Sequence, residues 1–385
     1  MSSKIKIVTH SEKGRCILAA NGIKKDEEIL REKPFVATQF AWNKESKYLC
    51  CSNCMYPLET AQDNVRRLTF DNTIMLPFPE CDKINLQNVV KCENCDDLYC
   101  SQSCLENEKM NNHEFYCNQL LPNGRFNEIY EVWKRCHYPP ETCSILMIIK
   151  LFALIKKKPM ETVEKLNEFC NRSVNEDLML AHKMLGDSYK SQISELQETM
   201  KKAFADDTEF ERYLTDDGFI SLLAIIGTNS QGIGTSSFAD YVKSISELQL
   251  SEEKRSEIDD FIDSIYTRLN ETVGEFLNSE GSGLYSIQSK INHSCNPNSE
   301  IIFPDSNSLL QVIALRDIKQ NEEITISYLD ECQLSRSRHS RQKYLQENYI
   351  FECFCEKCES QVNDADLTSD EGENYDDDDD NMDTD

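Results

Sequence analysis

The sequence has no long apolar run, which argues against a membrane protein. Its longest such run, Ile145 to Ile155, contains Lys150 and is too short to span a bilayer. Residues 1–15 contain no apolar stretch of the signal-peptide type either, so we expect no secretion. The expected location is therefore the cytoplasm, the nucleus or both.

Positive charge is also scarce. Against 68 Asp and Glu the chain has 41 Lys and Arg, for a net charge of −27. Residues 361–385 contribute twelve acids and no Lys or Arg, and the rest still carries −15. Gripping a nucleic-acid backbone needs clustered cations, so we expect no direct nucleic-acid partner, whereas a basic protein would suit this charge. The tail has almost no apolar side chains and is predicted to be disordered.

Cysteine, in contrast, is abundant, with eighteen residues. In a reducing compartment this number indicates metal binding more than disulfides. One segment has Cys-x2-Cys followed by Cys-x2-Cys-x4-Cys-x3-Cys-x8-His-x3-Cys, which predicts two closed tetrahedral zinc sites. The eight predicted ligands are Cys51, Cys54, Cys92, Cys95, Cys100, Cys104, His113 and Cys117. Cys50 and Cys81 flank this segment, and either of them could replace one of these ligands.

A second cysteine cluster lies near the C-terminus, at Cys353, Cys355 and Cys358. Three thiolates leave a tetrahedral zinc site one ligand short, and Cys295 is the predicted fourth donor. This site would tie the last segment back onto the loop after His293. The alternative is three free thiols without a metal.

The apolar pattern predicts an α+β protein with strands near both ends of the chain and helices from about residue 126 to 277. The strands are expected at residues 5–8, 16–20, 36–39, 299–303, 309–314 and 324–328. Residues 227–234, Gly-Thr-Asn-Ser-Gln-Gly-Ile-Gly, are predicted to form a glycine-rich loop. This loop lacks the Lys-Ser/Thr of a phosphate-binding P-loop.

One internal repeat joins the two ends of the sequence. Residues 19–29 and 314–324 share the pattern Ala-x3-Ile-Lys-x2-Glu-Glu-Ile. Two copies are too few for a solenoid. They predict two similar β-units that come together in one small domain.

Several motifs resemble those of a known family. Residues 292–298 read Asn-His-Ser-Cys-Asn-Pro-Asn, and residues 314–328 end in Glu-Glu-Ile-Thr-Ile-Ser-Tyr. Both are similar to the C-terminal half of a SET domain, residues 351–358 resemble its post-SET zinc segment, and Lys13-Gly-Arg resembles its first cofactor loop. The inserted cysteine segment resembles a MYND finger. The chain is thus identified as similar to the SET-and-MYND family of protein-lysine methyltransferases, and residues 227–237 and 335–341 are similar to one branch of it.

The resemblance implies a small-sheet, β-rich SET fold with a pseudoknot, split by a MYND finger and a helical insertion. The implied units are residues 1–50, the N-terminal SET part; 51–117, the MYND-type zinc finger; 118–280, a mainly helical insertion; 281–350, the C-terminal SET part; 351–360, the post-SET zinc segment; and 361–385, the acidic tail.

The resemblance also implies site residues. Tyr328 matches the tyrosine beside the transferred methyl group and is the predicted catalytic residue. S-adenosylmethionine is the implied cofactor, with three zinc ions. The predicted cofactor contacts are Lys13, Gly14, Arg15, Cys16, Asn229, Ser289, Asn292, His293, Tyr349 and Phe351.

The implied activity is methyl transfer from S-adenosylmethionine to a lysine of a basic protein, such as a histone tail or a ribosomal protein, by a monomer. One departure favours an alternative. The family loop is usually Gly-x-Gly, and here Cys16 replaces the second glycine, which would matter if that position needs a positive φ. The alternative is a catalytically weak zinc-dependent scaffold whose MYND finger binds peptides.

Overall fold

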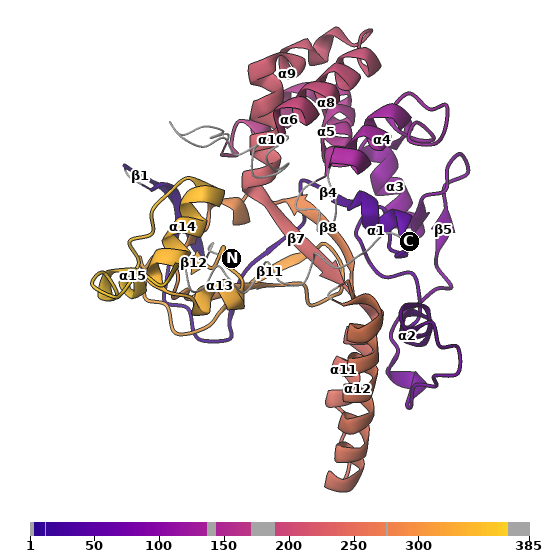
Figure 1. Cartoon of the computed structure of the whole chain (residues 1–385), viewed down its shortest axis with the longest axis vertical. Helices are drawn as coiled ribbons and strands as arrows, with labels where there is room; N and C mark the ends of the chain where they lie inside the picture. Colours follow the sequence, from indigo (N-terminus) through magenta and orange to yellow (C-terminus); the bar gives the residue numbers. More distant parts are fainter. Residues whose placement is uncertain (1–3, 12, 137–143, 171–188, 275, 369–385) are drawn as a thin grey trace, which may run out of the picture.

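The computed structural model describes residues 4–11, 13–136, 144–170, 189–274 and 276–368 (Figure 1). Most of the predicted acidic tail therefore lies outside the described residues. Among the helices that are described, none combines the length and the apolar character needed to cross a bilayer.

The strands are short and form several small sheets rather than one large one. Two sheets have three strands, in the orders β10-β11-β3 and β4-β8-β7, and the pairs β1-β2, β5-β6 and β12-β9 make three more. The strands are β1 Ile5–His10, β2 Gly14–Ala19, β3 Glu28–Glu32, β4 Val36–Gln39, β5 Val90–Lys91, β6 Leu98–Tyr99, β7 Ser230–Thr235, β8 Ser279–Leu284, β9 Asn292–His293, β10 Ser299–Ile302, β11 Leu310–Ala314 and β12 Thr325–Ile326.

Helices surround these sheets, which confirms the predicted α+β class (Figure 1). The α-helices are α1 Ala41–Glu45, α2 Ala61–Thr69, α3 Gln102–Met110, α4 Asn127–Cys136, α5 Ile145–Lys157, α6 Pro159–Leu166, α8 Tyr189–Ala203, α9 Glu211–Leu214, α10 Asp216–Asn229, α11 Ser237–Ser246, α12 Glu252–Val273, α13 Glu331–Ser335, α14 Arg338–Tyr349 and α15 Glu356–Ser360. The 3-10 turns are η1 Pro79–Cys81, η2 His113–Phe115, η3 Thr208–Phe210 and η4 Gln288–Lys290.

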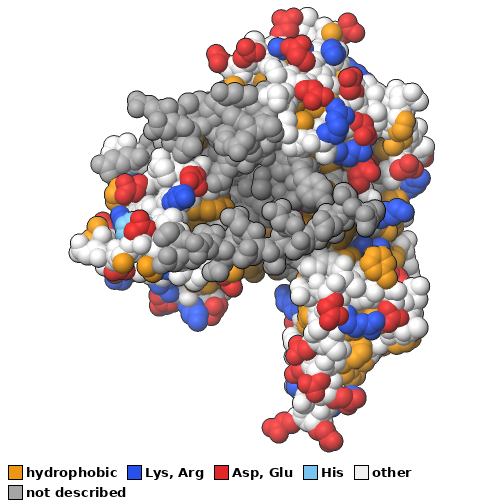
Figure 2. All heavy atoms as spheres, viewed as in Figure 1, with side chains coloured by type: hydrophobic (Ala, Val, Ile, Leu, Met, Phe, Trp, Pro, Cys, Tyr) orange, Lys and Arg blue, Asp and Glu red, His pale blue; other side chains and the backbone are white. Residues whose placement is uncertain are grey.

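The helices form separate groups around the sheets. Helices α5, α6, α8, α9 and α10 gather at one end of the molecule, while α13, α14 and α15 lie beside β12 (Figure 1). Helices α11 and α12 project away from the body as a hairpin (Figure 1). The free end of that hairpin carries acidic side chains (Figure 2). The first turn of α12 contains Glu252 and Glu253.

The two copies of the internal repeat pair with each other. Ile23 and Ile318, at equivalent positions, exchange both backbone hydrogen bonds, of 2.9 and 2.8 Å. The repeat carries the same left-handed turn in both copies, with φ of 64° at Asp26 and 65° at Asn321. Asp26 donates its N–H to Ala314 O, and Asn321 donates in the same way to the equivalent alanine of the first copy. The two ends of the chain therefore meet in one domain with local two-fold symmetry.

The glycine-rich stretch is not a loop, and the helical prediction for residues 126–277 is wrong at this point. Residues 230–235 form β7, an outer strand that pairs antiparallel with β8. The strand forms because Ile233 is buried in a hydrophobic core. In addition, the glycines of β8 leave room for this strand to lie between β4 and β7. A Cβ added at Gly281 of β8 would lie 2.2 Å from Thr38 O of β4. The predicted boundary at residue 280 falls inside β8.

Candidate active site and metal centres

The first metal cluster joins the two halves of the finger. The Sγ atoms of Cys51, Cys54, Cys100 and Cys104 all lie within 4.8 Å of one another. The distances from Cys54 to Cys100 and Cys104 are 3.7 and 3.8 Å. A tetrahedral zinc ion with bonds near 2.3 Å places its sulfurs about 3.8 Å apart, so this donor set fits zinc.

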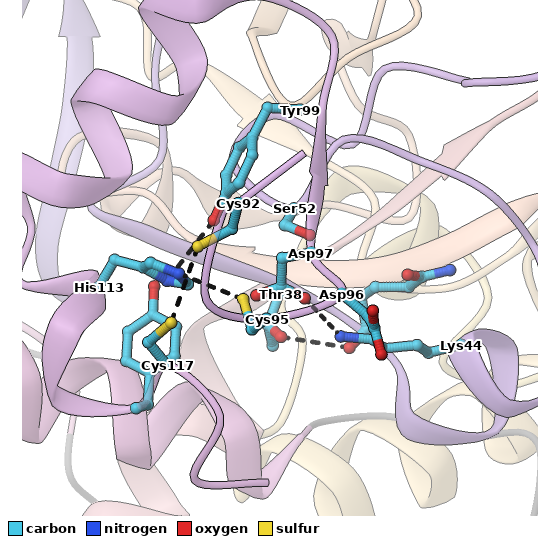
Figure 3. A network of polar contacts seen from close by, with 12 residues as sticks. Thr38, Lys44, Ser52, Cys92, Cys95, Asp96, Asp97, Tyr99, His113 and Cys117 are labelled. Carbon is cyan, nitrogen blue, oxygen red and sulfur yellow. Dashed lines mark hydrogen bonds and ion pairs between the residues drawn. The ribbon is translucent and has the colours of Figure 1, made fainter. Parts of the chain in front are cut away.

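The second cluster combines three thiols with one imidazole, at Cys92, Cys95, His113 and Cys117 (Figure 3). Cys92 and Cys117 have their sulfurs 3.7 Å apart, and His113 Nε2 lies 3.5 Å from Cys95 Sγ. The neighbouring Asp97 accepts a 2.7 Å bond from Lys44 Nζ of α1, which ties the finger to the β4 region. The set suits a structural zinc ion.

Cys50 and Cys81 belong to none of the clusters found among the described residues. Both are buried. Burial raises the pKa of the Cys50 thiol to about 12, so it stays protonated and packs as a small apolar side chain. Neither residue therefore replaces a ligand in this structure.

The third cluster connects distant parts of the chain. Cys295, in the loop after β9, lies with Cys353, Cys355 and Cys358 from the C-terminal segment, and its sulfur is 3.6 Å from that of Cys358. Three of the four side chains are buried. Four thiols in this arrangement again fit tetrahedral zinc. With the other two, this gives the three zinc sites that the cysteine pattern predicts.

Beside the third cluster, β9 runs parallel to β12, pairing Asn292 with Thr325 and His293 with Ile326. The loop that follows β9 carries Cys295 to the metal cluster. The pairing of β9 with β12 positions the Asn-His pair predicted to contact the cofactor.

His293 is held in one tautomer. Its Nδ1 accepts a 2.9 Å bond from the backbone N–H of Tyr328, so the ring proton is on Nε2, 3.2 Å from Cys295 Sγ. Burial lowers the pKa of His293 to about 4, and the imidazole is therefore neutral. Its ring links the metal cluster to the predicted catalytic tyrosine.

Tyr328 lies in an aromatic cluster. Ring centroids are 4.9 Å apart for Tyr328 and Tyr349, 6.2 Å for Tyr328 and Phe351, and 5.4 Å for Tyr328 and His293. The Tyr328 hydroxyl donates a 2.7 Å bond to Ile291 O. Burial raises the pKa of Tyr328 and Tyr349, for Tyr349 to about 12, so both are neutral phenols.

A left-handed residue brings Tyr349 and Phe351 to the same side. Helix α14 ends at Ile350, which has φ of 59° and ψ of 40°. This conformation is rare for a β-branched residue and costs on the order of 1–3 kcal/mol. Such strain is characteristic of functional sites, and here it lies between the two predicted cofactor-binding aromatics.

Glu323 joins the N-terminal cofactor loop to strand β9. One of its carboxylate oxygens forms a 2.8 Å ion pair with Lys13 Nζ. The other accepts a 2.9 Å hydrogen bond from Asn292 Nδ2. Lys13 and Asn292 were predicted as cofactor contacts, but Glu323 was not. Its only signal in the sequence is its place as the second glutamate of the repeated Glu-Glu-Ile.

The backbone conformation at position 16 accommodates cysteine, although the family loop usually has glycine there. Gly14 has φ of 72°, whereas Cys16 is absent from the residues with positive φ and lies buried in β2. The left-handed conformation therefore falls on the glycine that is present. Arg15, between them, is partly exposed.

The other two predicted contacts are Asn229 and Ser289. The Asn229 amide donates to Cys170 O and Ile225 O at 2.7 and 2.8 Å and accepts a 3.1 Å bond from Cys170 N. It thus fastens the segment that follows α6. Ser289 is partly buried in η4, and the Glu32 carboxylate accepts 2.9 Å bonds from the backbone N–H groups of Ile287, just before η4, and of Gln288, its first residue.

Comparison with known proteins agrees with this arrangement. The model of the SET domain family matches residues 14–329. Protein-lysine N-trimethyltransferase SMYD5 of Gallus gallus is 43% identical over 368 residues, which cover 94% of this chain and 87% of the relative. The chain belongs to the SET-and-MYND family of protein-lysine methyltransferases. It is therefore an S-adenosylmethionine-dependent enzyme.

Further relatives specify the branch. SMYD5 of Homo sapiens is 41% identical over 376 residues, covering 96% of this chain and 90% of the relative. Histone-lysine N-methyltransferase SMYD3 of Homo sapiens is 48% identical but over 92 residues, 24% of this chain and 20% of that relative. The predicted resemblance to one branch of the family is thus confirmed, and that branch is the one of the SMYD5 relatives.

Proposed function

We propose that this enzyme methylates lysine side chains of a basic protein, a histone or a ribosomal protein, with Tyr328 as the catalytic residue. The observation that supports this most directly is the aromatic cluster around the Tyr328 ring, next to the Asn292-His293 pair. Relatives named as trimethyltransferases suggest that up to three methyl groups are added.

The chemistry needs a neutral, oriented amine. A free lysine has a pKa of about 10.4, so deprotonation at neutral pH costs roughly 4–5 kcal/mol. Aromatic walls made by Tyr328, Tyr349 and Phe351 exclude water and lower that pKa. They also tolerate a methylammonium product through cation–π attraction.

When bound, S-adenosylmethionine supplies an electrophilic methyl group whose bond to sulfur breaks as the bond to the amine nitrogen forms. The proton of the amine leaves to solvent beforehand. The Tyr328 hydroxyl donates to Ile291 O at 2.7 Å, and its oxygen keeps a lone pair that can accept an amine N–H and aim the nitrogen. Lys13, Gly14, Arg15, Cys16, Ser289 and Asn292 are proposed to hold the cofactor, while Asn229 holds the backbone at Cys170. The rest of the rate comes from proximity.

A basic substrate is supported by charge. Outside residues 361–385 the chain carries −15, which attracts cationic partners over distances near the Debye length. We propose that the enzyme acts as a monomer in the cytoplasm or nucleus and that the finger also binds peptides.

The experiment is methyl transfer by the zinc-loaded full chain with isotopically labelled S-adenosylmethionine. Core histones, purified ribosomal proteins and an acidic protein of similar lysine content serve as acceptors, and mass spectrometry locates the label. We expect label on lysines of a basic acceptor and none on the acidic one. No label on any acceptor, despite cofactor binding, would favour the scaffold alternative.

A further inference from the structure

Arg341 of α14 is a buried cation. The residue is 1% exposed and is among the largest fully buried side chains of the described chain. Its Nη1 donates a 2.5 Å bond to Arg336 O, and its Nη2 donates a 2.7 Å bond to Gln361 Oε1. Both acceptors are neutral, and no carboxylate of a described residue forms an ion pair with this guanidinium. Burying a charge is costly unless another charge offsets it.

The offsetting charge lies in the third metal cluster. Arg341 Nη2 is 3.6 Å from Cys358 Sγ, within reach of an N–H to sulfur hydrogen bond. Zinc with four thiolates has a formal charge of about −2. Since three of these four cysteines are buried, solvent screens that charge poorly. A cation in direct contact with a ligand sulfur is therefore favourable for both groups.

The other clusters differ in this respect. The first also has four thiols, but three of them are partly exposed, and the donor to Cys104 Sγ is the neutral amide of Asn53 at 3.4 Å. The second has three thiols and His113, so its formal charge with zinc is about −1. In the described part of the chain, the most buried four-thiol cluster is thus the one in contact with a buried arginine.

We propose that Arg341 is the counter-ion of the third zinc centre and that it slows loss of that metal. The guanidinium neutralises part of the thiolate charge, and its hydrogen bond to the Cys358 sulfur holds that ligand in place. Its bond to Gln361 also holds the chain just after α15 against α14. This assigns a role to one arginine of the arginine-rich stretch 335–341.

The test is zinc release from the full-length, zinc-loaded protein, followed with a chromophoric chelator. Arg341→Met removes the charge, Arg341→Lys keeps the charge but loses the forked geometry, and Lys343→Met removes a charge from the exposed side of the same helix. Removing a partner behind a metal ligand typically weakens metal binding 10–100-fold. The Cys355→Ser variant lacks a ligand of the third site and is expected to hold two zinc ions. The release phase that it lacks therefore belongs to the third site.

We expect Arg341→Met to release one of three zinc equivalents at least about tenfold faster, with the other two unchanged. Arg341→Lys should release the same equivalent about threefold faster, and Lys343→Met should behave as wild type. Wild-type release from Arg341→Met, or equal acceleration of all three equivalents, would overturn the proposal. Should Arg341→Met not fold, zinc release from Arg341→Lys at the wild-type rate would overturn the proposal. None of these readouts depends on methyl transfer.

Discussion

The Tyr328 hydroxyl is the single group on which catalysis is proposed to depend. Tyr328→Phe removes the oxygen that aims the amine but keeps the ring contacts with Tyr349 and Phe351. We expect kcat to fall by about 10²-fold, the cost of misplacing a reacting group by about 1 Å. Binding of S-adenosylhomocysteine should stay within about twofold of wild type.

The control for this variant is Tyr266→Phe, which changes a tyrosine on α12 that packs against Phe238. Its kcat should equal that of wild type. A Tyr328→Phe enzyme with full kcat would exclude Tyr328 as the catalytic residue and leave the aromatic wall as a purely packing feature.

Glu323 is expected to be a positioning residue for the cofactor. Glu323→Gln weakens the ion pair to Lys13 while keeping the size of the side chain, so the N-terminal loop loses its link to Asn292. We predict about tenfold weaker S-adenosylhomocysteine binding, since bonds to charged groups are worth roughly 1.5–3 kcal/mol. At saturating cofactor, kcat should change little.

Glu300→Gln makes the same change at an exposed position of β10 and should bind S-adenosylhomocysteine with the affinity of the wild type. Combining Lys13→Met with Glu323→Gln should give no more loss than either change alone. Additive losses in this double-mutant cycle would mean that the two residues act separately.

Lys150 of α5 connects three other parts of the structure: α3, β4 and the finger. Its Nζ lies 2.7 Å from Glu108 Oε1 of α3 and donates to Ala37 O of β4 and Ser52 O of the finger at 3.0 and 3.1 Å. The Glu108 side chain is 6% exposed. Lys150→Met leaves that carboxylate buried without its cation, so we expect a loss of about 3–5 kcal/mol in unfolding free energy by denaturant titration.

Lys201→Met provides the comparison, because Lys201 pairs with Glu198 on an exposed helix face. It should cost less than about 1 kcal/mol. Adding Glu108→Gln to Lys150→Met should restore part of the stability. Equal costs for the two lysine variants would show that the finger is not held to α5 by this buried charge.

Some elements could be predicted from the sequence because their determinants are local. The cysteine spacings predicted all three metal clusters, since metal ligands must be close and are few in kind. The repeat predicted two matching β-units, and Asp26 and Asn321 both adopt the left-handed turn, which short polar side chains tolerate. The strand over Val36–Gln39 has the predicted bounds.

Other features depend on partners far away in the sequence. Strand β7 was missed because glycines carry no strand propensity, and its pairing with β8 and the burial of Ile233 outweigh that deficit. Glu323 and Arg341 look like ordinary surface charges until Lys13 and Cys358 are brought beside them. The left-handed Ile350 contradicts its own residue preference, and only packing around the site can hold it there.

At the scale of the whole molecule, three distant segments converge on one place. These segments are the loop at Gly14, the chain around β9 and the C-terminal cysteines. Glu323, the β9-β12 pairing and the third metal cluster join them. We propose that this convergence makes the cofactor site and that zinc at Cys295 closes it.

Calorimetric titration with S-adenosylhomocysteine tests this claim most directly, on the zinc-loaded wild type and on Cys355→Ser. We expect one equivalent to bind to the wild type, and at least about tenfold weaker binding to the variant, because Tyr349 and Phe351 lose their anchor. Equal affinity in both proteins, or no binding heat in the wild type, would contradict the account.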